Sequence, residues 1–438
     1  MDLRVNKYAK KLQEMIKCET ISYEEEKDMK RFDVFHAKLK KWFPNVFKKC
    51  KVEYFHGSLL IRWKGKTSKN PIMFMNHHDV VEASGDWKYE PFKAKIVNGK
   101  MYGRGTLDTK TGLFAMLQAA DELIAKGFVP NQDIYFESGC NEETNGNGAK
   151  EIADVLAKRK IKFDYLIDEG GMIVYEPLGG VKANYAMIGL GERGRAALKF
   201  TAKSNGGHAS TPEKGSPLVR LGEMMSYIDN HNIFKVEISD TVVEMLKRLS
   251  SNVDGGVKYI YKYANIFRPL LKLIMPNVSS TAKAMTQTTL AFTMASGSEG
   301  SNVIPETAYV IGDMRISHHE GFKASFNAVK EVARKFDVEV SVFEQPTESN
   351  VASYNSKGFK LAEQAVKQVY GDKVYTAPYI MNQCSDARFM SKLCKNCLRF
   401  TPLLITNEQM HSIHGLNEFV DIKYLDKAVD FYKFLMEA

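Results

Sequence analysis

The sequence predicts an α/β protein in which a larger domain with a mainly parallel sheet is interrupted by a smaller α+β domain. Strand-like and helix-like segments alternate over residues 1–186, a pattern typical of parallel sheets. Residues 187–345 instead follow the order βαββαβ, which is the arrangement of small split βαβ domains. The alternation resumes over residues 346–438, so we expect the larger domain to be discontinuous.

Apolar periodicity defines the elements of the first part. Apolar residues at i, i+3 and i+4 predict two helices, whereas short apolar or alternating runs predict three strands. The helices are Leu113–Lys126, which Gly127 ends, and Asn147–Arg159. The strands are Asn70–Asn76, Gln132–Ser138 and Phe163–Asp168.

The middle part carries the βαββαβ order with one insertion. Its predicted elements are strand Arg195–Ala202, helix Pro217–Asn230, strands Gln287–Ala295 and Ala308–Ile316, helix Gly321–Phe336 and strand Val338–Glu344. A helical insertion at about 240–285 separates the first helix from the second strand. After it, helix Ser356–Tyr370 returns to the style of the first part.

Length and composition restrict the class of protein. A chain of 438 residues exceeds one ordinary core, and 44% hydrophobic with 26% charged residues is normal for a globular enzyme or binding protein. The formal charge of +9 is spread along the chain, and the short basic stretch Lys38–Lys51 favours a helix face over a nucleic-acid site. Six cysteines are too few for a disulfide scaffold at this length.

Membrane and secretory segments are not expected. The N-terminal residues are typical of an amphipathic helix and lack the apolar core of a signal peptide. The most apolar region, Tyr259–Met275, is interrupted by Lys262, Arg268, Pro269 and Lys272, so it cannot span a bilayer. We therefore expect a cytoplasmic protein with neither a membrane nor a nucleic acid as partner.

Adjacent carboxylates at Glu142 and Glu143 follow the predicted strand Gln132–Ser138. Burying both is costly unless a cation or a shared proton compensates. A metal offers one solution, because one glutamate can bind it while the other moves protons for a bound water. Most such pairs are solvated surface, so the pair alone does not decide the matter.

Further candidate ligands stand at the ends of predicted elements. Strand alternation puts His77 and Asp79 on one side, where the carboxylate could hold the second imidazole nitrogen; the alternative is a polar turn. Asp108 follows a glycine-rich loop and could equally be a helix N-cap. Glu169 could lie in a plain acidic turn, and His414 could simply pair with a carboxylate four residues on.

Together these positions favour a metal centre. His77, Asp108, Glu143, Glu169 and His414 all fall at or near element ends of the α/β part. Two histidines and three carboxylates suit two zinc ions with one carboxylate bridging them. The same ligands tolerate cobalt or manganese.

The chain resembles a known family in nine ordered motifs that span nearly its whole length. The motifs are NHHDVV, GRGTLDTKTG, NEE, DEGG, GERGRAALKF, GGHASTP, GSNVIPE, CSDARF and HGLNEFV. They are similar to those of the M-twenty type zinc metallopeptidases, a family that includes aminoacylase, carboxypeptidase G, succinyl-diaminopimelate desuccinylase and the vacuolar Gly-X carboxypeptidase. The helical insertion resembles the Gly-X carboxypeptidase and long-chain N-acyl amino-acid hydrolase branch.

The resemblance implies roles for the metal ligands. His77, Asp108 and Glu169 would hold one zinc, while Glu143, His414 and the bridging Asp108 would hold the other. It also implies a cis peptide after Asp108. Two departures, Cys384 in place of a small residue and Asn76 in place of glycine, remove no proposed ligand.

The resemblance implies catalytic and binding roles as well. Glu142 would be the general base and later the acid, and Asp79 would orient His77. The middle domain would be a lid and dimerisation domain whose His208 stabilises the oxyanion, either within its own subunit or across a homodimer. The expected contacts to substrate carboxylate or backbone are Arg193, Asn302 and Arg315.

Three functions remain as hypotheses. The first is a dizinc dipeptidase or carboxypeptidase that cleaves short peptides. The second is an N-acyl amino-acid amidohydrolase with the same chemistry on another acyl group. The third is an inactive binding protein on the same fold, which a missing base or ligand would indicate; neither is missing in this sequence.

Overall fold

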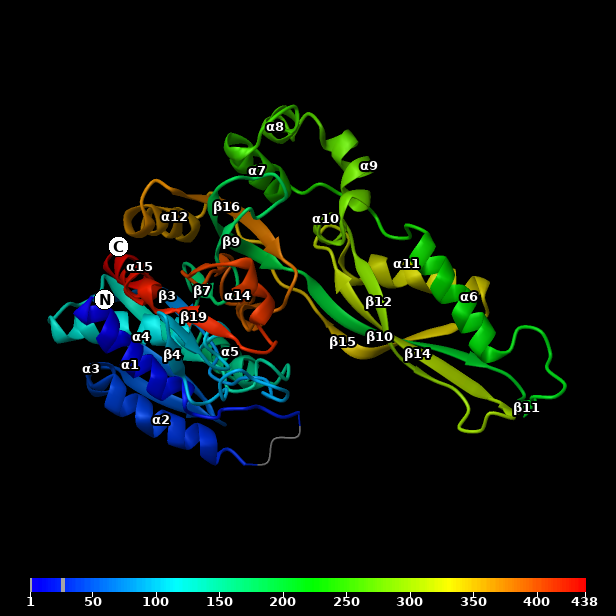
Figure 1. The fold of residues 1–438 in the computed structure, drawn as a ribbon, viewed down its shortest axis with the longest axis horizontal. Coiled ribbons are helices and arrows are strands. Elements are labelled where there is room, and N and C mark those ends of the chain that lie inside the picture. The colour runs from blue at the N-terminus through cyan, green and yellow to red at the C-terminus, as the bar shows by residue number, and fades with distance from the viewer. Residues whose placement is uncertain (1, 25–27) are drawn as a thin grey trace.

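The computed structural model describes residues 2–24 and 28–438, which form one broad α/β body and one elongated sheet (Figure 1). Both termini lie on the α/β body. A ten-stranded sheet runs through this body in the order β1-β2-β6-β3-β7-β17-β9-β8-β18, and β16 pairs with β9. Its strands are β1 Lys51–Phe55, β2 Ser58–Trp63, β3 Thr67–Met75, β6 Gln132–Ser138, β7 Leu166–Asp168, β8 Ile173–Tyr175, β9 Asn184–Glu192, β16 Val374–Met381, β17 Cys397–Arg399 and β18 Leu404–Ile405.

The large sheet is mixed, although its centre is parallel as predicted. Strands β6, β3, β7 and β17 run parallel to one another, whereas β1 and β2 form an antiparallel hairpin. The hairpin turn is His56-Gly57, and both residues have positive φ (43° and 91°), which is the geometry of the tight turns that join antiparallel strands. Strand β17 also meets β9 antiparallel.

Helices cover both faces of the large sheet, which explains the continuous apolar run in β3. Ile72 and Phe74 belong to a core with the helices of one face, whereas Met73 and Met75 belong to a core with those of the other face. The first group of helices is α1 Leu3–Ile16, α2 Lys30–Trp42, α3 Pro44–Lys49, α4 Lys110–Ala125, α12 Lys357–Tyr370 and α15 Leu425–Glu437. The second is α5 Gly148–Lys158 and α13 Ala387–Met390. Successive side chains of a strand point to opposite faces, so a strand covered on both faces is apolar throughout.

The elongated sheet has the order β12-β14-β10-β15 and is antiparallel throughout. Helices α6 and α11 share one apolar core with it. In chain order the elements are β10 Gly194–Lys203, α6 Pro217–Asn230, β12 Thr289–Ser296, β14 Thr307–Ile316, α11 Gly321–Lys335 and β15 Glu339–Thr347. A two-stranded ribbon, β11 Gly207–His208 with β13 Val303–Ile304, lies at the far end of this sheet.

The helical insertion packs on the large sheet. It consists of α7 Asp240–Leu249, η1 Ser250–Asn252, α8 Val257–Lys262, α9 Arg268–Val278 and α10 Ser280–Thr286. Val242, Met245 and Leu249 share a core with Tyr185 of β9 and Ala377 of β16. Strand β9 itself crosses the boundary expected at residue 186, because it pairs with β16 through Glu192.

The remaining elements are short. They are β4 Lys95–Val97, β5 Lys100–Tyr102 and β19 Phe419–Asp421, which form a three-stranded sheet, with α14 Asn407–Ser412 and η2 Ile422–Tyr424. Within the described residues, no helix combines the length and the hydropathy that crossing a bilayer requires.

Candidate metal centre

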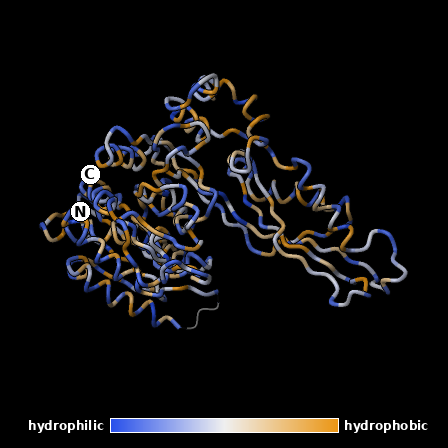
Figure 2. The backbone as a smooth tube through the Cα atoms, viewed as in Figure 1, coloured by the Kyte–Doolittle hydropathy of each residue, from blue (hydrophilic) through white to orange (hydrophobic). Residues whose placement is uncertain are grey.

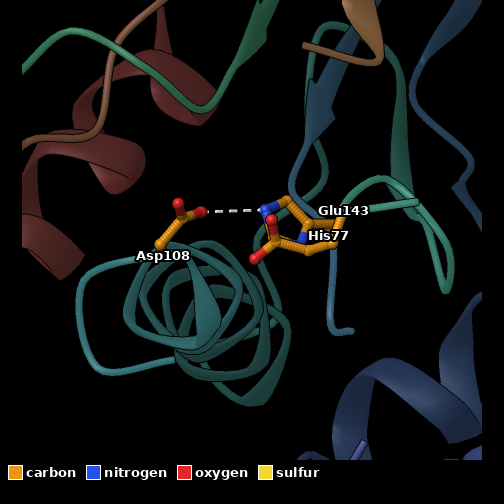
Figure 3. A group of neighbouring side chains, drawn as sticks. All are labelled: His77, Asp108 and Glu143. Carbon is orange, nitrogen blue, oxygen red and sulfur yellow. Dashed lines mark hydrogen bonds and ion pairs between the residues drawn. The ribbon is translucent and has the colours of Figure 1, made fainter. Parts of the chain in front are cut away.

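Loops at the carboxyl ends of the parallel strands bring together side chains that are distant in sequence. His77 follows β3, Glu143 follows β6, and Asp108 lies in the loop between β5 and α4, two residues before α4 begins. One potential ligand atom from each of these three residues lies within 4.8 Å of the others. Figure 3 shows the three side chains converging, with His77 Nε2 3.0 Å from Asp108 Oδ1. Strand ends of this kind are where open α/β sheets bind ligands.

His414 closes the cluster from the other end of the chain. Its Nε2 lies 3.1 Å from Asp108 Oδ2 and 2.9 Å from Glu143 Oε2. Asp108 therefore contacts a different imidazole with each of its two oxygens. Burial opposes ionisation of Asp108, but the hydrogen bonds from His414 and His77 prevail and lower its pKa. His414 has a φ of +57° in the loop after α14, so it cannot be part of a helical i,i+4 pair.

Glu169 follows β7 and is influenced by the charges of Asp108 and His77. It is not one of the three residues whose ligand atoms lie within 4.8 Å of one another. Burial, and next to it the Asp108 carboxylate, raise the pKa of Glu169 well above its usual value, whereas His77 acts in the opposite direction. A buried carboxyl in such an environment favours a compensating cation. The sequence-predicted ligands thus lie around one carboxylate, Asp108.

Asp79 supports both the histidine and the glutamate pair. Its Oδ1 is 3.3 Å from His77 Nδ1. The same carboxylate accepts hydrogen bonds from the backbone N–H groups of Glu142 and Glu143, at 3.2 and 3.1 Å, and from the Ser22 hydroxyl at 2.7 Å. One buried aspartate therefore sets the orientation of His77 and the path of the turn that carries both glutamates.

The two adjacent glutamates have different surroundings. Glu143 directs Oε2 to His414, while its buried Oε1 has no hydrogen-bond partner among the described residues. The Glu142 side chain is 13% exposed, and its partial burial raises its pKa well above the usual value. The Arg388 guanidinium, 3.8 Å from Glu142 Oε1, acts in the opposite direction. Glu143 therefore offers an unsatisfied acceptor to the cluster, whereas Glu142 lies beside a cationic side chain.

The donor set fits a metal ion. An orphaned carboxylate oxygen in a buried site is the unsatisfied acceptor that a cation would complete. Imidazole together with carboxylate is a ligand combination that suits zinc. Asp79, which contacts the outward nitrogen of His77, provides the outer support that metal-binding histidines commonly have.

Sequence reasoning missed the residue that holds the Asp108 loop. The fully buried Glu418 accepts hydrogen bonds from the backbone N–H groups of Gly105 (3.1 Å), Leu107 (2.7 Å) and Asp108 (3.3 Å), and from Arg104 Nη1 (2.9 Å). The sequence offered Glu418 only as a helical partner of His414. Its place in the HGLNEFV motif was the one signal of a further role.

The alternative that Asp108 caps a helix is excluded. Helix α4 begins at Lys110 with Thr109 at its N-cap, and Asp108 instead turns its carboxylate to the two histidines. The peptide bond between Asp108 and Thr109 is cis, as the family resemblance implies.

A second group that sequence reasoning missed consists of three buried carboxyl side chains next to the cluster, those of Glu137, Asp168 and Asp386. Glu137 is fully buried, and neither of its carboxyl oxygens has a partner among the described residues. Burial raises the pKa of Asp386, which belongs to the CSDARF motif, to about 7. Asp168 accepts backbone N–H bonds from Glu169 and Ala387, at 2.8 and 2.7 Å, and so ties the Glu169 turn to the same motif.

The remaining predicted residues lie on or beside the elongated sheet. His208 is exposed on β11, with Nδ1 2.7 Å from the Ser210 hydroxyl, and the Asn302 carbonyl accepts a bond from Ala209 at the same end. Figure 1 places β11 far from the α/β body, so His208 and Asn302 do not join the cluster within one chain. Arg193 is buried at the junction of the two bodies, where its Nη2 donates to the Gln287 carbonyl at 2.8 Å.

Arg315, on strand β14 of the elongated sheet, contacts the CSDARF motif of the α/β body. It pairs with Asp313 at 2.7 Å, and its Nη1 lies 3.6 Å from Cys384 Sγ. Cys384 immediately precedes Ser385 and Asp386. Of the three residues predicted to contact the substrate, Arg193 and Arg315 therefore both lie beside Cys384, whereas Asn302 lies at the far end of the elongated sheet.

Similar proteins match this chain over most of its length. A family model described as peptidase family M20/M25/M40 matches residues 73–438. A probable carboxypeptidase S-like 2 of Dictyostelium discoideum is 30% identical over 444 residues, covering 98% of this chain and 84% of the relative. The human N-fatty-acyl-amino acid synthase/hydrolase PM20D1 is 29% identical over 367 residues, covering 83% of this chain and 73% of the relative.

Solved structures share the fold at lower identity. The metallo-carboxypeptidase Sso-CP2 of Sulfolobus solfataricus superposes with a TM-score of 0.71 and 20% identity, covering 100% of this chain and 99% of that one. Human carnosine dipeptidase 1 superposes with a TM-score of 0.66 and 17% identity, covering 99% and 96%. The likeness extends over the α/β body and the elongated sheet together.

Proposed function

This chain belongs to peptidase family M20/M25/M40, and we propose that it is a dizinc hydrolase that cleaves the amide bond of short peptides with a free carboxylate. The chain is a metal-dependent peptidase or amidohydrolase by family. The observation that carries the finer proposal is the position of Asp108. Its two oxygens face two different imidazoles at 3.0 and 3.1 Å, which supports a role for Asp108 as a ligand shared by two ions.

The proposed ligands divide around this bridge. His77, Asp108 and Glu169 would hold one ion, and Asp108, Glu143 and His414 the other. When bound, the ions would supply a water of lowered pKa and polarise the scissile carbonyl. Zinc suits the set best, while cobalt and manganese are compatible with it.

The proton transfers fall to Glu142. Its carboxylate would take a proton from the attacking water as the C–O bond forms, and would return it to the leaving amine nitrogen as the C–N bond breaks. The partly buried setting of Glu142 supports this role, because burial raises its pKa and a raised carboxyl pKa is common among catalytic bases. Asp79 would keep His77 oriented throughout.

Substrate contacts and the oxyanion require the elongated sheet. We propose that this sheet acts as a lid and dimerisation domain, and that His208 reaches the oxyanion of the partner subunit in a homodimer. The exposure of His208 at the far end of its own chain supports an action in trans. Arg193, Asn302 and Arg315 would contact the substrate carboxylate or backbone.

A second candidate function is hydrolysis of N-acyl amino acids. It is favoured by relatives named N-fatty-acyl-amino acid synthase/hydrolase, among them the human protein at 29% identity. The same metal ligands and the same Glu142 would serve, because only the acyl group differs. An inactive binding protein is disfavoured, since none of the proposed ligands and neither glutamate is missing from the sequence.

One experiment separates these functions. The zinc-loaded protein would be assayed against a panel of dipeptides and a panel of N-acyl amino acids with short and long acyl chains. A Glu142→Gln preparation, purified in the same way, controls for contaminating hydrolases. We expect the larger kcat/KM on a dipeptide. Hydrolysis of N-acyl amino acids alone would select the second candidate, and no hydrolysis of either panel would refute both.

A further inference from the structure

The helical insertion carries an unusual concentration of exposed apolar side chains. Of the 23 large apolar side chains that are exposed in the described part of the chain, eight lie within residues 257–278. They are Val257, Tyr259, Tyr263, Ile266, Leu270, Leu273, Ile274 and Val278, and we refer to them as the α8–α9 surface. Scattered single apolar residues need no explanation, but a contiguous group of this kind marks an interaction site.

Helix α9 is apolar on two different sides. Leu271 and Met275 are buried in the core that joins the insertion to the large sheet. Leu270, Leu273 and Ile274 follow the helical spacing i, i+3, i+4 on the exposed side, and Leu273 is 72% exposed. Figure 2 shows hydrophobic colouring along this helix, at the upper edge of the molecule. The inner side thus anchors the insertion and leaves the outer side without a partner among the described residues.

The charged residues of the same segment are all basic. Residues 255–298 contain no aspartate or glutamate, but they contain five basic residues. Two of these are already paired within or next to the insertion, because Arg268 pairs with Asp240 of α7 at 2.5 Å and Lys272 pairs with Glu237 at 2.9 Å. Lys258 and Lys262 are exposed on α8.

The lysines of α8 stand next to its tyrosines. Lys258 is followed by Tyr259, and Lys262 is followed by Tyr263. The second pair stands four residues after the first, with Tyr263 at the C-cap of α8. The Lys262 ammonium lies 5.4 Å from the centre of the Tyr263 ring. Tyrosines and lysines at this spacing are typical of helices that lie at the boundary between water and lipid.

We propose that the α8–α9 surface docks on an anionic lipid membrane, with α8 and α9 lying in the plane of the interface. The apolar side chains would enter the headgroup region, and Lys258 and Lys262 would meet the acidic headgroups. A second copy of this chain fits less well, because a two-fold contact would oppose two acid-free basic segments. The expectation of no membrane partner rested on the lack of a spanning segment, and an interfacial helix needs none.

Vesicle binding of the full chain tests the proposal without relying on its enzymatic activity. Flotation would compare phosphatidylcholine vesicles with vesicles that contain about one third phosphatidylserine. One variant, Ile266→Ser with Leu273→Ser, removes apolar contacts from exposed positions. A second, Lys258→Gln with Lys262→Gln, removes two charges. The matched controls are Leu3→Ser with Val34→Ser, and Lys48→Gln with Lys49→Gln, all exposed and outside the insertion.

The proposal predicts binding of the unaltered chain to the acidic vesicles and not to the neutral ones. The lysine variant should weaken this binding about 25-fold, on the basis of an electrostatic contribution of roughly fivefold for each of its two lysines. The serine variant should weaken it at least about tenfold, because it removes two apolar side chains from the headgroup region, while the controls leave binding unchanged. Absence of binding by the unaltered chain, or equal loss in the control variants, would overturn the proposal. So would a serine variant that changes the oligomeric state while vesicle binding stays the same, because the surface would then serve a second copy.

Discussion

Replacing Glu418 by glutamine should destabilise the protein and weaken its metal site, although the two side chains have nearly the same shape. Glu418 Oε2 accepts from Arg104 Nη1 and from the Gly105 N–H, at 2.9 and 3.1 Å. Its Oε1 accepts from the N–H groups of Leu107 and Asp108, at 2.7 and 3.3 Å. A glutamine has one accepting oxygen, so its NH2 group must face one of these two sets of donors.

The expected loss of stability follows from the more favourable of the two orientations of the glutamine amide. With the amide oxygen toward Leu107 and Asp108, the NH2 group opposes Arg104, whose side chain is 3% exposed. Breaking a buried ion pair from one side costs about 3–5 kcal/mol, and the buried Gly105 N–H loses its acceptor as well. We therefore expect a loss of about 4 kcal/mol in the free energy of unfolding. Displacement of the Asp108 loop should weaken metal binding by about 10–100-fold.

Urea unfolding followed by circular dichroism measures the first quantity, and metal content after dialysis measures the second. Glu408→Gln is the matched control, because Glu408 is 73% exposed and lies 3.7 Å from Lys100; it should cost at most about 0.5 kcal/mol. A change in Glu418→Gln below about 1 kcal/mol, with normal metal content, would refute the positioning role.

Three further predictions address the site and the fold. Glu142→Ala should keep its metal content yet lower kcat by about 10²–10⁴-fold, because only proton transfer is removed; near-normal turnover would exclude Glu142 as the base. His414→Ala should lose bound metal, and retention of two ions per chain by elemental analysis would contradict its role as a ligand. Burial lowers the pKa of His36 from 6.5 to about 4, so unfolding binds a proton between these values and stability falls as pH falls through that window. The unaltered chain should lose about 2 kcal/mol from this group between pH 7 and 5, and equal pH dependence in His36→Phe, measured by urea unfolding, would show that His36 does not contribute.

Local periodicity was sufficient for most elements. The predicted strand Gln132–Ser138 and helix Pro217–Asn230 have the bounds found in the structure, because their apolar spacing reports directly which faces are buried. The strand predicted from Phe163 begins only at Leu166, since Phe163 forms an isolated bridge with Cys394. The mainly parallel sheet is in fact mixed, because strands such as β1 and β2 join through a tight turn that alternation alone does not distinguish.

The partners of single side chains required the tertiary structure. Glu418 could have paired with His414 on a helix, but the loop conformation of His414 prevents this and the burial of Glu418 directs it to the Asp108 loop. Likewise the helical insertion belonged by sequence to the middle domain, yet its apolar face packs on β9 and β16. Sequence position does not specify which of two available apolar surfaces a helix will cover.

The sequence by itself determined the α/β class, the order of the elements and the chemical types of the candidate ligands, because these depend on residue spacing and on motifs. Tertiary structure alone decided that His414 meets Asp108 and Glu143, that Glu142 lies beside Arg388, and that His208 lies far from them in its own chain. The physical reason is that a metal site depends on distances between loops, which the packing of the sheet and its helices sets. Spacing along one strand or helix does not contain that information.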